Sequence, residues 1–167
     1  GDSCEILRNV APVDPKAVLE AIERAANGER SEQFLSINNY TRTTIARLLR
    51  SIAWDAKYFE RCMAILLQFA MAEPEDYKTD STRSLITSLF TIYLSGTHAT
   101  AQQRADWINS TLKSSNEKMR NLGMECLDSA LESHHFTSHY GFDFGARSRD
   151  YGYTPQRGPE TRAWFDL

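Results

Sequence analysis

The sequence predicts an all-α fold, and three of its features support this prediction. Valine occurs only at positions 10, 13 and 18, whereas alanine and leucine are abundant. Proline is absent from residues 16–73 and 75–154, so long helices are free to form. The apolar pattern of residues 45–71 also returns about sixty residues later, in residues 105–131. Such recurrence is typical of stacked helical repeats, in which each unit buries an apolar face on its neighbour.

The first of about six expected helices spans residues 15–27. Asp14 is a suitable N-cap, and Pro15 occupies the first helical position, where its missing N–H does no harm. Asn27-Gly28 is a common helix end, because glycine readily adopts the backbone conformation that follows the last turn. Both ends of this helix are therefore signalled in the sequence.

The second and third helices are expected to form an antiparallel hairpin. The second runs from about Tyr40 to Ala53, and the third begins after Asp55 and lasts until Pro74. The join between them is too short for any other arrangement of neighbouring helices. The third helix is apolar on two faces, which predicts burial on two sides. These apolar residues are Phe59, Cys62, Met63, Ile65, Leu66, Phe69 and Ala70.

The remaining three helices occupy the second half of the chain. The fourth is expected at about Thr82 to Leu94, with Gly96 as its C-cap. Two residue pairs have the spacing of capping boxes and mark the starts of the fifth and sixth helices: Thr100 with Gln103, and Ser114 with Glu117. We group the six helices into two three-helix units, with residues 14–133 as the helical array of a single domain, 1–167.

The C-terminal extension, residues 134–167, differs in kind. From Phe142 onward it holds three of the eight glycines and two of the five prolines, so it cannot be one regular helix. It is also rich in large aromatic residues, which can regain their ordering entropy by docking on the array. We therefore expect an irregular but ordered tail packed on the helices. The aromatic residues are Phe142, Phe144, Tyr151, Tyr153, Trp164 and Phe165.

The helix number, the hairpin joins and the apolar pattern of residues 14–133 resemble a short α-solenoid of the armadillo or HEAT type. This resemblance implies a right-handed α-α superhelix that binds a partner. The proline and the Asp/Arg positions of consensus HEAT helices are not evident here, and a helical bundle without superhelical twist is the alternative. Similar helical arrays recur as sensor or scaffold segments of large bacterial multidomain ATPases.

Composition indicates an ordinary globular protein and leaves the partner open. The net charge of −3 does not imply a nucleic-acid or membrane partner, and no signal peptide or long apolar run is evident. The three cysteines, Cys4, Cys62 and Cys126, are odd in number and lack the close spacing of a metal site. Cys62 and Cys126 fall on the apolar faces of expected helices, as reduced cysteines do, which fits a cytosolic compartment. We expect a cytoplasmic protein without a cofactor. Because residue 1 is glycine, we also expect the chain to be a piece of a larger protein.

The strongest candidate for a binding face lies on the second helix. Residues 33–54 contain three arginines, Arg42, Arg47 and Arg50, and no acidic residue. Of this stretch, Arg47, Arg50 and Trp54 have the spacing of one helix face. Guanidinium and indole groups together suit a partner's carboxylates or phosphates. Three arginines on a solvated face are also common in proteins without such a partner, and nearby acids can neutralise them.

Arg147 and Arg149 stand among aromatic residues, as in many proteins that bind single-stranded RNA. The four arginines from Phe142 onward are matched by four acids, however, and a neutral tail makes a poor site for a polyanion. We favour packing of the rings and pairing of the charges, and we keep a nucleic-acid-binding helical domain as the alternative function.

His135 and His139 are weak candidates for a metal site. They lie four residues apart and could share a helix face. The glutamate of an HExxH motif is absent, and histidines also gather at helix C-termini because cations are stable there. A metal-dependent enzyme at this segment is the second alternative.

No catalytic signature accompanies these candidates, because the chain has neither a nucleophile elbow nor a phosphate-binding loop. We therefore assign no catalytic residue and expect a non-enzymatic protein-interaction or scaffold module of a larger, bacterial, multidomain protein. The expected partner is a protein, a peptide or another domain of the parent chain.

Overall fold

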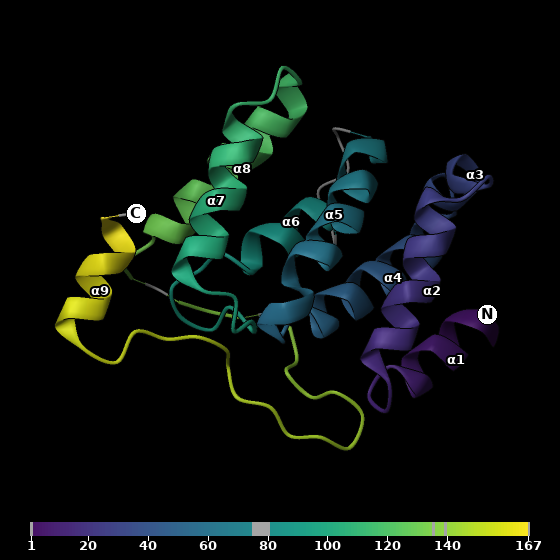
Figure 1. Cartoon of the computed structure of the whole chain (residues 1–167), viewed down its shortest axis with the longest axis horizontal. Helices are drawn as coiled ribbons and strands as arrows, with labels where there is room; N and C mark the ends of the chain where they lie inside the picture. Colours follow the sequence, from purple (N-terminus) through teal and green to yellow (C-terminus); the bar gives the residue numbers. More distant parts are fainter. Residues whose placement is uncertain (1, 75–80, 135, 139, 167) are drawn as a thin grey trace.

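A computed structural model describes residues 2–74, 81–134, 136–138 and 140–166, and this part of the chain is all-α (Figure 1). The helices are α1 (Asp2–Val10), α2 (Pro15–Asn27), α3 (Ser31–Leu35), α4 (Asn39–Ile52), α5 (Ala56–Ala72), α6 (Thr82–Ser88), α7 (Ala101–Leu112), α8 (Glu117–Leu131) and α9 (Gly158–Phe165). The described residues form no strand, and only an isolated bridge joins Phe144 to Arg147. The predicted fold class is confirmed.

The helices follow one another across the molecule, with α1 to α3 at one end and α9 at the other (Figure 1). α4 packs on α5, α7 packs on α8, and α6 contacts α4, α5 and α8. The two stretches whose apolar pattern recurs therefore each form a pair of contacting helices, and α6 joins the two pairs. The superhelical repeat itself stays a prediction.

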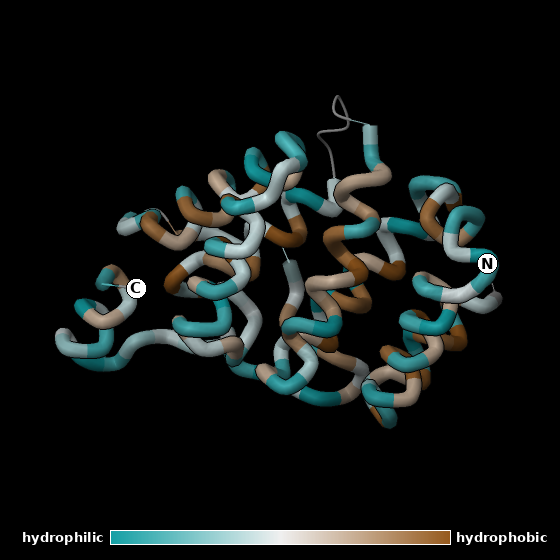
Figure 2. Tube along the Cα trace, turned by 45° about the horizontal axis from the view of Figure 1, so that its top comes forward, coloured by the Kyte–Doolittle hydropathy of each residue, from teal (hydrophilic) through white to brown (hydrophobic). Residues whose placement is uncertain are grey.

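α5 lies at the centre of the helices that precede α7. It contacts α2, α3, α4 and α6, and its two apolar faces are fully buried, as the sequence predicts. Figure 2 shows that the hydrophobic segments of the helices lie largely where the helices face one another. None of the described helices combines the length and the apolar character that crossing a membrane requires.

Side-chain caps explain where several helices begin. Asp14, Asn38 and Asp55 each accept a hydrogen bond from a backbone N–H in the first turn of α2, α4 and α5. Thr100 and Gln103 form the predicted capping box of α7. The prediction for α8 is wrong in detail. Its cap is Asn116, which accepts from the N–H of Met119, so Ser114 and Glu117 do not form a capping box.

The fourth predicted helix is shorter than expected, because α6 ends at Ser88 instead of Leu94. The residues that follow are largely buried without being helical, and Leu94 has a positive φ of 57°. Two arginine side chains bind carbonyl groups in this segment, those of Thr91 and Ser95. These carbonyls therefore accept hydrogen bonds from side chains and not from a helix backbone. The apolar residues that predicted a helix up to Leu94 are largely buried in an irregular segment instead.

Three short helices, α1, α3 and α9, were not predicted. α3 has five residues and no side-chain cap, so the sequence carries little signal for it. α9 begins with the Gly158-Pro159 pair, which is a common helix start, but it lies in the tail that was expected to be irregular. Its single buried side chain, Trp164, holds it to the end of the array.

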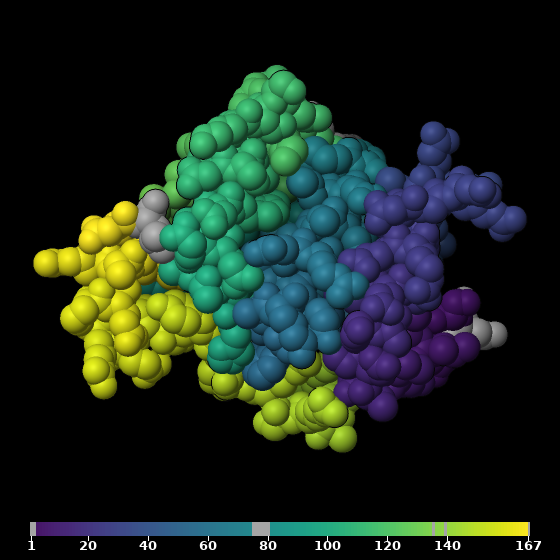
Figure 3. All heavy atoms as spheres, viewed as in Figure 1, coloured from purple at the N-terminus to yellow at the C-terminus, as the bar shows by residue number. Residues whose placement is uncertain are grey.

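The tail packs on the array, as predicted. We call residues 140–157 the strap. The strap leaves the α8 end of the molecule, passes along one edge of the helices and returns to α9, as Figures 1 and 3 show. At its far point Gly145 packs closely on Pro12, in the connection between α1 and α2. The strap thus contacts the array from one end to the other.

Candidate binding surface

The predicted arginine face is not an open surface. Arg47 is exposed on α4, but Arg50 is only 4% exposed and Trp54 is half-buried. Arg50 binds α6 and the segment that follows it, and Tyr140 of the strap covers its guanidinium group. The expectation that Arg47, Arg50 and Trp54 share one exposed face is therefore wrong. The helix spacing was correct, but the sequence did not show that other segments of the chain pack against this face of α4.

Arg50 binds groups from two other parts of the chain. Its Nε donates to Ser88 Oγ at 2.9 Å, and its Nη2 donates to the Ser95 carbonyl at 3.1 Å. The guanidinium also lies 4.4 Å from the ring centre of Tyr140 and 5.9 Å from that of Phe142. Burial lowers the pKa of Arg50 to about 10, so it remains charged at neutral pH. Two rings of the strap thus cover a buried cation.

Arg104, on α7, repeats this arrangement near the other end of the strap. It is 1% exposed, and it donates to the carbonyls of Ala99 and Thr91 at 3.1 and 3.0 Å. Its guanidinium lies 4.8 Å from the ring centre of Trp164 and 5.7 Å from that of Tyr153. Burial lowers the pKa of Arg104 to about 9. Rings of the strap and of α9 therefore cover this second cation.

Arg149 is a strap residue that reaches back to α4. Its guanidinium lies 4.0 Å from the ring centre of Phe144 and 4.7 Å from that of Trp54, and its Nη1 donates to the Ser51 carbonyl. Burial, followed by the charge of Arg147, lowers the pKa of Arg149 to about 10. Arg149 therefore packs within the molecule, but it contacts rings and a carbonyl instead of the acid that the sequence predicted as its partner.

The next strap residues pair with the segment before α7. The Gly96 N–H donates to the Tyr151 carbonyl at 2.9 Å, and the Tyr153 N–H donates to the Thr97 carbonyl at 2.7 Å. Gly152, between them, has a φ of 87°, and a Cβ there would lie 2.4 Å from Thr97 N. Only glycine fits this close approach of two backbones. The strap is thus bound by main-chain hydrogen bonds, as an extended peptide ligand would be.

Asp150 adds polar contacts at the same place. Its Oδ1 lies 2.8 Å from His98 Nε2 and accepts from the Gly152 N–H at 3.0 Å, and its carbonyl accepts from the Trp54 indole at 3.3 Å. Burial raises the pKa of this carboxyl, but the hydrogen bonds from Gly152 and His98 outweigh burial and lower the pKa. These contacts fix the turn of the strap over Trp54.

Arg147 has an exposed side chain at the far bend of the strap, where its backbone pairs with Phe144. Of the five candidate residues, Arg47 and Arg147 are exposed, whereas Arg50, Trp54 and Arg149 bind other parts of the chain. The structure brings Trp54 and Arg149 together, in a contact that their distance in sequence did not reveal.

A small apolar groove lies between α7, α8 and α9. Its volume is about 190 Å³, and its lining includes Ala105, Ile108 and Leu112 of α7, Leu127 and Leu131 of α8, and Phe165 of α9. Leu131 is 50% exposed and Phe165 is 44% exposed. Trp164 closes one side of the groove, where its indole N–H donates to the Ala130 carbonyl at 2.8 Å. This groove is an apolar surface that the chain covers only in part.

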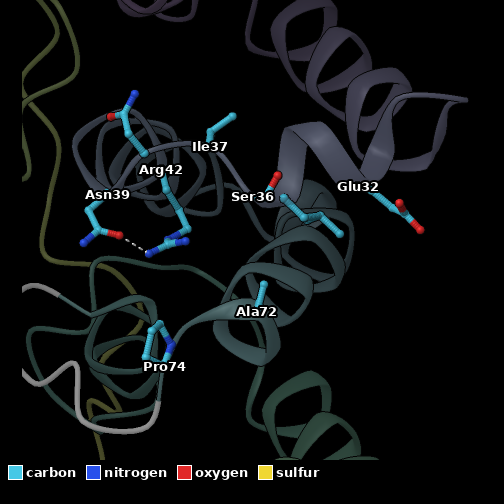
Figure 4. A pocket seen from close by; sticks show the side chains of 9 residues that line it. Glu32, Ser36, Ile37, Asn39, Arg42, Ala72 and Pro74 are labelled. Carbon is cyan, nitrogen blue, oxygen red and sulfur yellow. Dashed lines mark hydrogen bonds between the residues drawn. The ribbon is translucent and has the colours of Figure 1, made fainter.

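A wider depression of about 740 Å³ lies between the α3–α4 connection and the end of α5 (Figure 4). Arg42 lines it and donates to Asn39 Oδ1 at 2.5 Å, and its Nε lies 3.3 Å from Glu73 Oε1. The Glu73 carboxylate also accepts from the backbone and hydroxyl of Thr82. Because Arg42 and Glu73 are both buried and neutralise each other, we interpret this cluster as a structural link between α4, α5 and α6.

His135 and His139 lie outside the described residues, so the metal hypothesis stays a prediction. Within the described residues, no group of three or more His, Cys, Asp or Glu side chains is placed to hold a metal ion. Cys62 and Cys126 are buried among apolar side chains, and burial raises the pKa of both thiols. These two thiols are packing residues.

Arg104 and Gly152 are the important residues of this surface that the sequence did not single out. Arg104 lies one turn from Ala101 and Ile108 on the inward side of α7, and a charge among inward-facing apolar residues is a detectable signal. Gly152 carries no such signal, because its role depends on Thr97, which is far away in sequence. Compared with known proteins, the chain matches no family, no curated protein and no solved structure.

Proposed function

We propose that the chain is a non-enzymatic module that binds another protein, and that the groove between α7, α8 and α9 is its open binding surface. The partly exposed apolar lining of this groove is the observation that supports the proposal. Half-exposed large apolar side chains that adjoin one groove are typical of interaction sites, whereas isolated ones are common on any surface.

The groove suits an amphipathic helix from the partner. Its α7 wall presents Ala101, Ala105, Ile108 and Leu112, which follow helical spacing along the axis. α9 already occupies one side of the groove by inserting Trp164, so the same surface accepts a helix within the chain. A second helix beside α9 would continue this interface and cover Leu131 and Phe165.

The nucleic-acid alternative has less support. Arg50 and Arg149 donate to carbonyl groups of the chain and lie over its aromatic rings, so they are not presented to a phosphate backbone. Loss of any nucleic-acid binding with rising salt would be its signature. We therefore place partner binding at the apolar groove.

An unbiased selection of helical peptides against the whole chain tests this proposal. Peptides that bind should recognise the groove, so Leu131→Asp should weaken them by about tenfold or more, as for a central interface residue. Met124→Asp is the matched control, because Met124 is 49% exposed on the same helix and does not line the groove. Affinities measured by titration calorimetry would compare the two variants. Selected peptides that bind Leu131→Asp as well as the wild type would contradict the proposal.

A further inference from the structure

Two buried cations lie beneath the strap and α9 without a carboxylate beside them. Within the described residues, the hydrogen-bond acceptors of Arg50 and Arg104 are carbonyl and hydroxyl oxygens, and neither residue forms an ion pair. Each guanidinium is otherwise covered by aromatic rings. A buried cation is normally paired with an acid, because removal from water destabilises the charged form. The lowered pKa of both groups is consistent with this lack of an acidic neighbour.

The strap that covers them is bound in the manner of a peptide ligand. It has no helix of its own, and two main-chain hydrogen bonds join it to Gly96 and Thr97. Phe144 of the strap is buried. The other side-chain contacts of the strap include rings over cations, hydrogen bonds that join Arg149 to Ser51 and Trp54 to Asp150, and one exposed pair, His98 with Asp150. Such contacts are individually weak at a surface.

The strap is able to leave the array without unfolding it. It begins beyond the end of α8 and returns to α9, and Trp164 of α9 is tied to Ala130 at the end of α8. Both ends of the strap therefore stay attached to the same end of the molecule while the middle lifts away. The helices beneath have their own core, whose buried residues come almost entirely from α2 and α4 to α8 and the segments between them.

We propose that the array edge formed by Arg50, Trp54, Gly96–Thr97 and Arg104 is a second binding site, for an extended segment of a partner protein that carries aromatic and acidic residues, and that the strap occupies this site until the partner displaces it. The partner's backbone pairs with Gly96 and Thr97, and its carboxylates pair with the two arginines. This site adjoins the apolar groove at Arg104, which lines both. It does not depend on the function proposed for the groove.

Two fluorescein-labelled synthetic peptides serve as probes: one has the strap sequence, residues 140–157, and the other has the same sequence with Tyr140→Glu. The protein is the full chain with Gly152→Val. This substitution forces a Cβ against the Thr97 backbone and so weakens the docking of the protein's own strap. Gly141→Val is the matched control, since a Cβ at Gly141 meets no atom within 4 Å. Because the attached strap competes at an effective concentration of about millimolar, the wild type should bind either peptide at least roughly tenfold more weakly than Gly152→Val does.

Fluorescence anisotropy should show saturable binding to Gly152→Val and equally weak binding to the wild type and Gly141→Val. The Tyr140→Glu peptide should bind Gly152→Val more tightly than the strap sequence, and Arg50→Met in the same protein should remove that advantage. A folded Gly152→Val protein that binds neither peptide overturns the proposal. Equal affinity of the two peptides overturns the preference for an acidic partner.

The wild type provides a test that does not depend on the folding of a variant. A saturating amount of the Tyr140→Glu peptide should speed hydrogen exchange at the protein's own Tyr153 amide, because the displaced strap loses its bond to the Thr97 carbonyl. The Gly96 amide should stay protected, because a carbonyl of the peptide replaces that of Tyr151 as the acceptor of the Gly96 N–H. Unchanged exchange at Tyr153 under saturation overturns displacement.

Discussion

Two arginine side chains are buried in this molecule because of the groups that surround them. Arg50 and Arg104 are cations inside the protein because carbonyl and hydroxyl oxygens take up their N–H groups and aromatic rings shield them. Their pKa values of about 10 and about 9 leave both charged at neutral pH. Tyr140 and Phe142 of the strap lie over Arg50, and Tyr153 of the strap and Trp164 of α9 lie over Arg104.

Trp164 connects the last helix to the array by one hydrogen bond and a buried ring. Trp164→Phe keeps an aromatic ring over Arg104 but leaves the Ala130 carbonyl without its donor. The expected loss of unfolding free energy is about 1–2 kcal/mol, the usual range for a buried acceptor that loses its partner. Urea denaturation followed by circular dichroism measures it. The exposed neighbour Phe165→Leu is the control, and an equal loss for both would contradict this role for the indole.

The three cysteines should differ sharply in reactivity. Cys62 and Cys126 are buried and their thiol pKa is raised, whereas Cys4 is partly exposed on α1. Since the thiolate is the reactive form, one thiol per chain should react rapidly with a disulfide reagent in the native protein and three in denaturant. Absorbance of the released thiolate counts them. Fast reaction of two or more thiols in the native protein would show that the buried sites open readily.

At the level of the helices, the sequence predicted several N-caps correctly. Asp14, Asp55 and Thr100 cap the helices that they were expected to cap, since a cap is a local feature of three or four residues. The end of α6 was not predictable in this way. Buried apolar residues continue beyond Ser88, and the conformation there depends on Arg50 and Arg104, which come from other helices.

The start of α8 offers a test of the N-cap that differs from the sequence prediction. Asn116→Ala removes the acceptor of the Met119 N–H and should lower the unfolding free energy by about 1 kcal/mol. Ser114→Ala removes only an exposed contact to the Asn116 N–H and should cost less. Thermal and urea unfolding of the two variants would rank them. A larger loss for Ser114→Ala would favour the cap predicted from the sequence.

The strap should loosen in acid. The pKa of Asp150 is lowered in the folded protein, so its ionised form favours docking of the strap above its ordinary pKa of about 4, and this contribution is lost as pH falls through the lower folded value. The stability difference between the wild type and Asp150→Asn should therefore be present at pH 6 and smaller at pH 3. Urea midpoints at the two pH values measure it. A difference that grows on acidification would contradict the sign of this shift.

At the scale of the whole molecule, the sequence predicted the helices and the packed tail but not the path of the tail. The apolar pattern that recurs in residues 45–71 and 105–131 corresponds to the helix pairs α4–α5 and α7–α8. Periodicity reports which face of a helix is buried, and it does not report what buries it. Arg50 illustrates this limit, because it lies on the polar side of α4 by spacing and is covered by residues about ninety positions later.

The strap is docked along the array and covers Arg50 and Arg104. Native-state hydrogen exchange at the Gly96 and Tyr153 amides is a direct test of this docking, because each amide donates to the other segment. Both amides should be protected in the wild type and in Gly141→Val, and both should exchange faster in Gly152→Val. Exchange of the two amides at the rate of an unstructured peptide in the wild type would show that the strap is not docked.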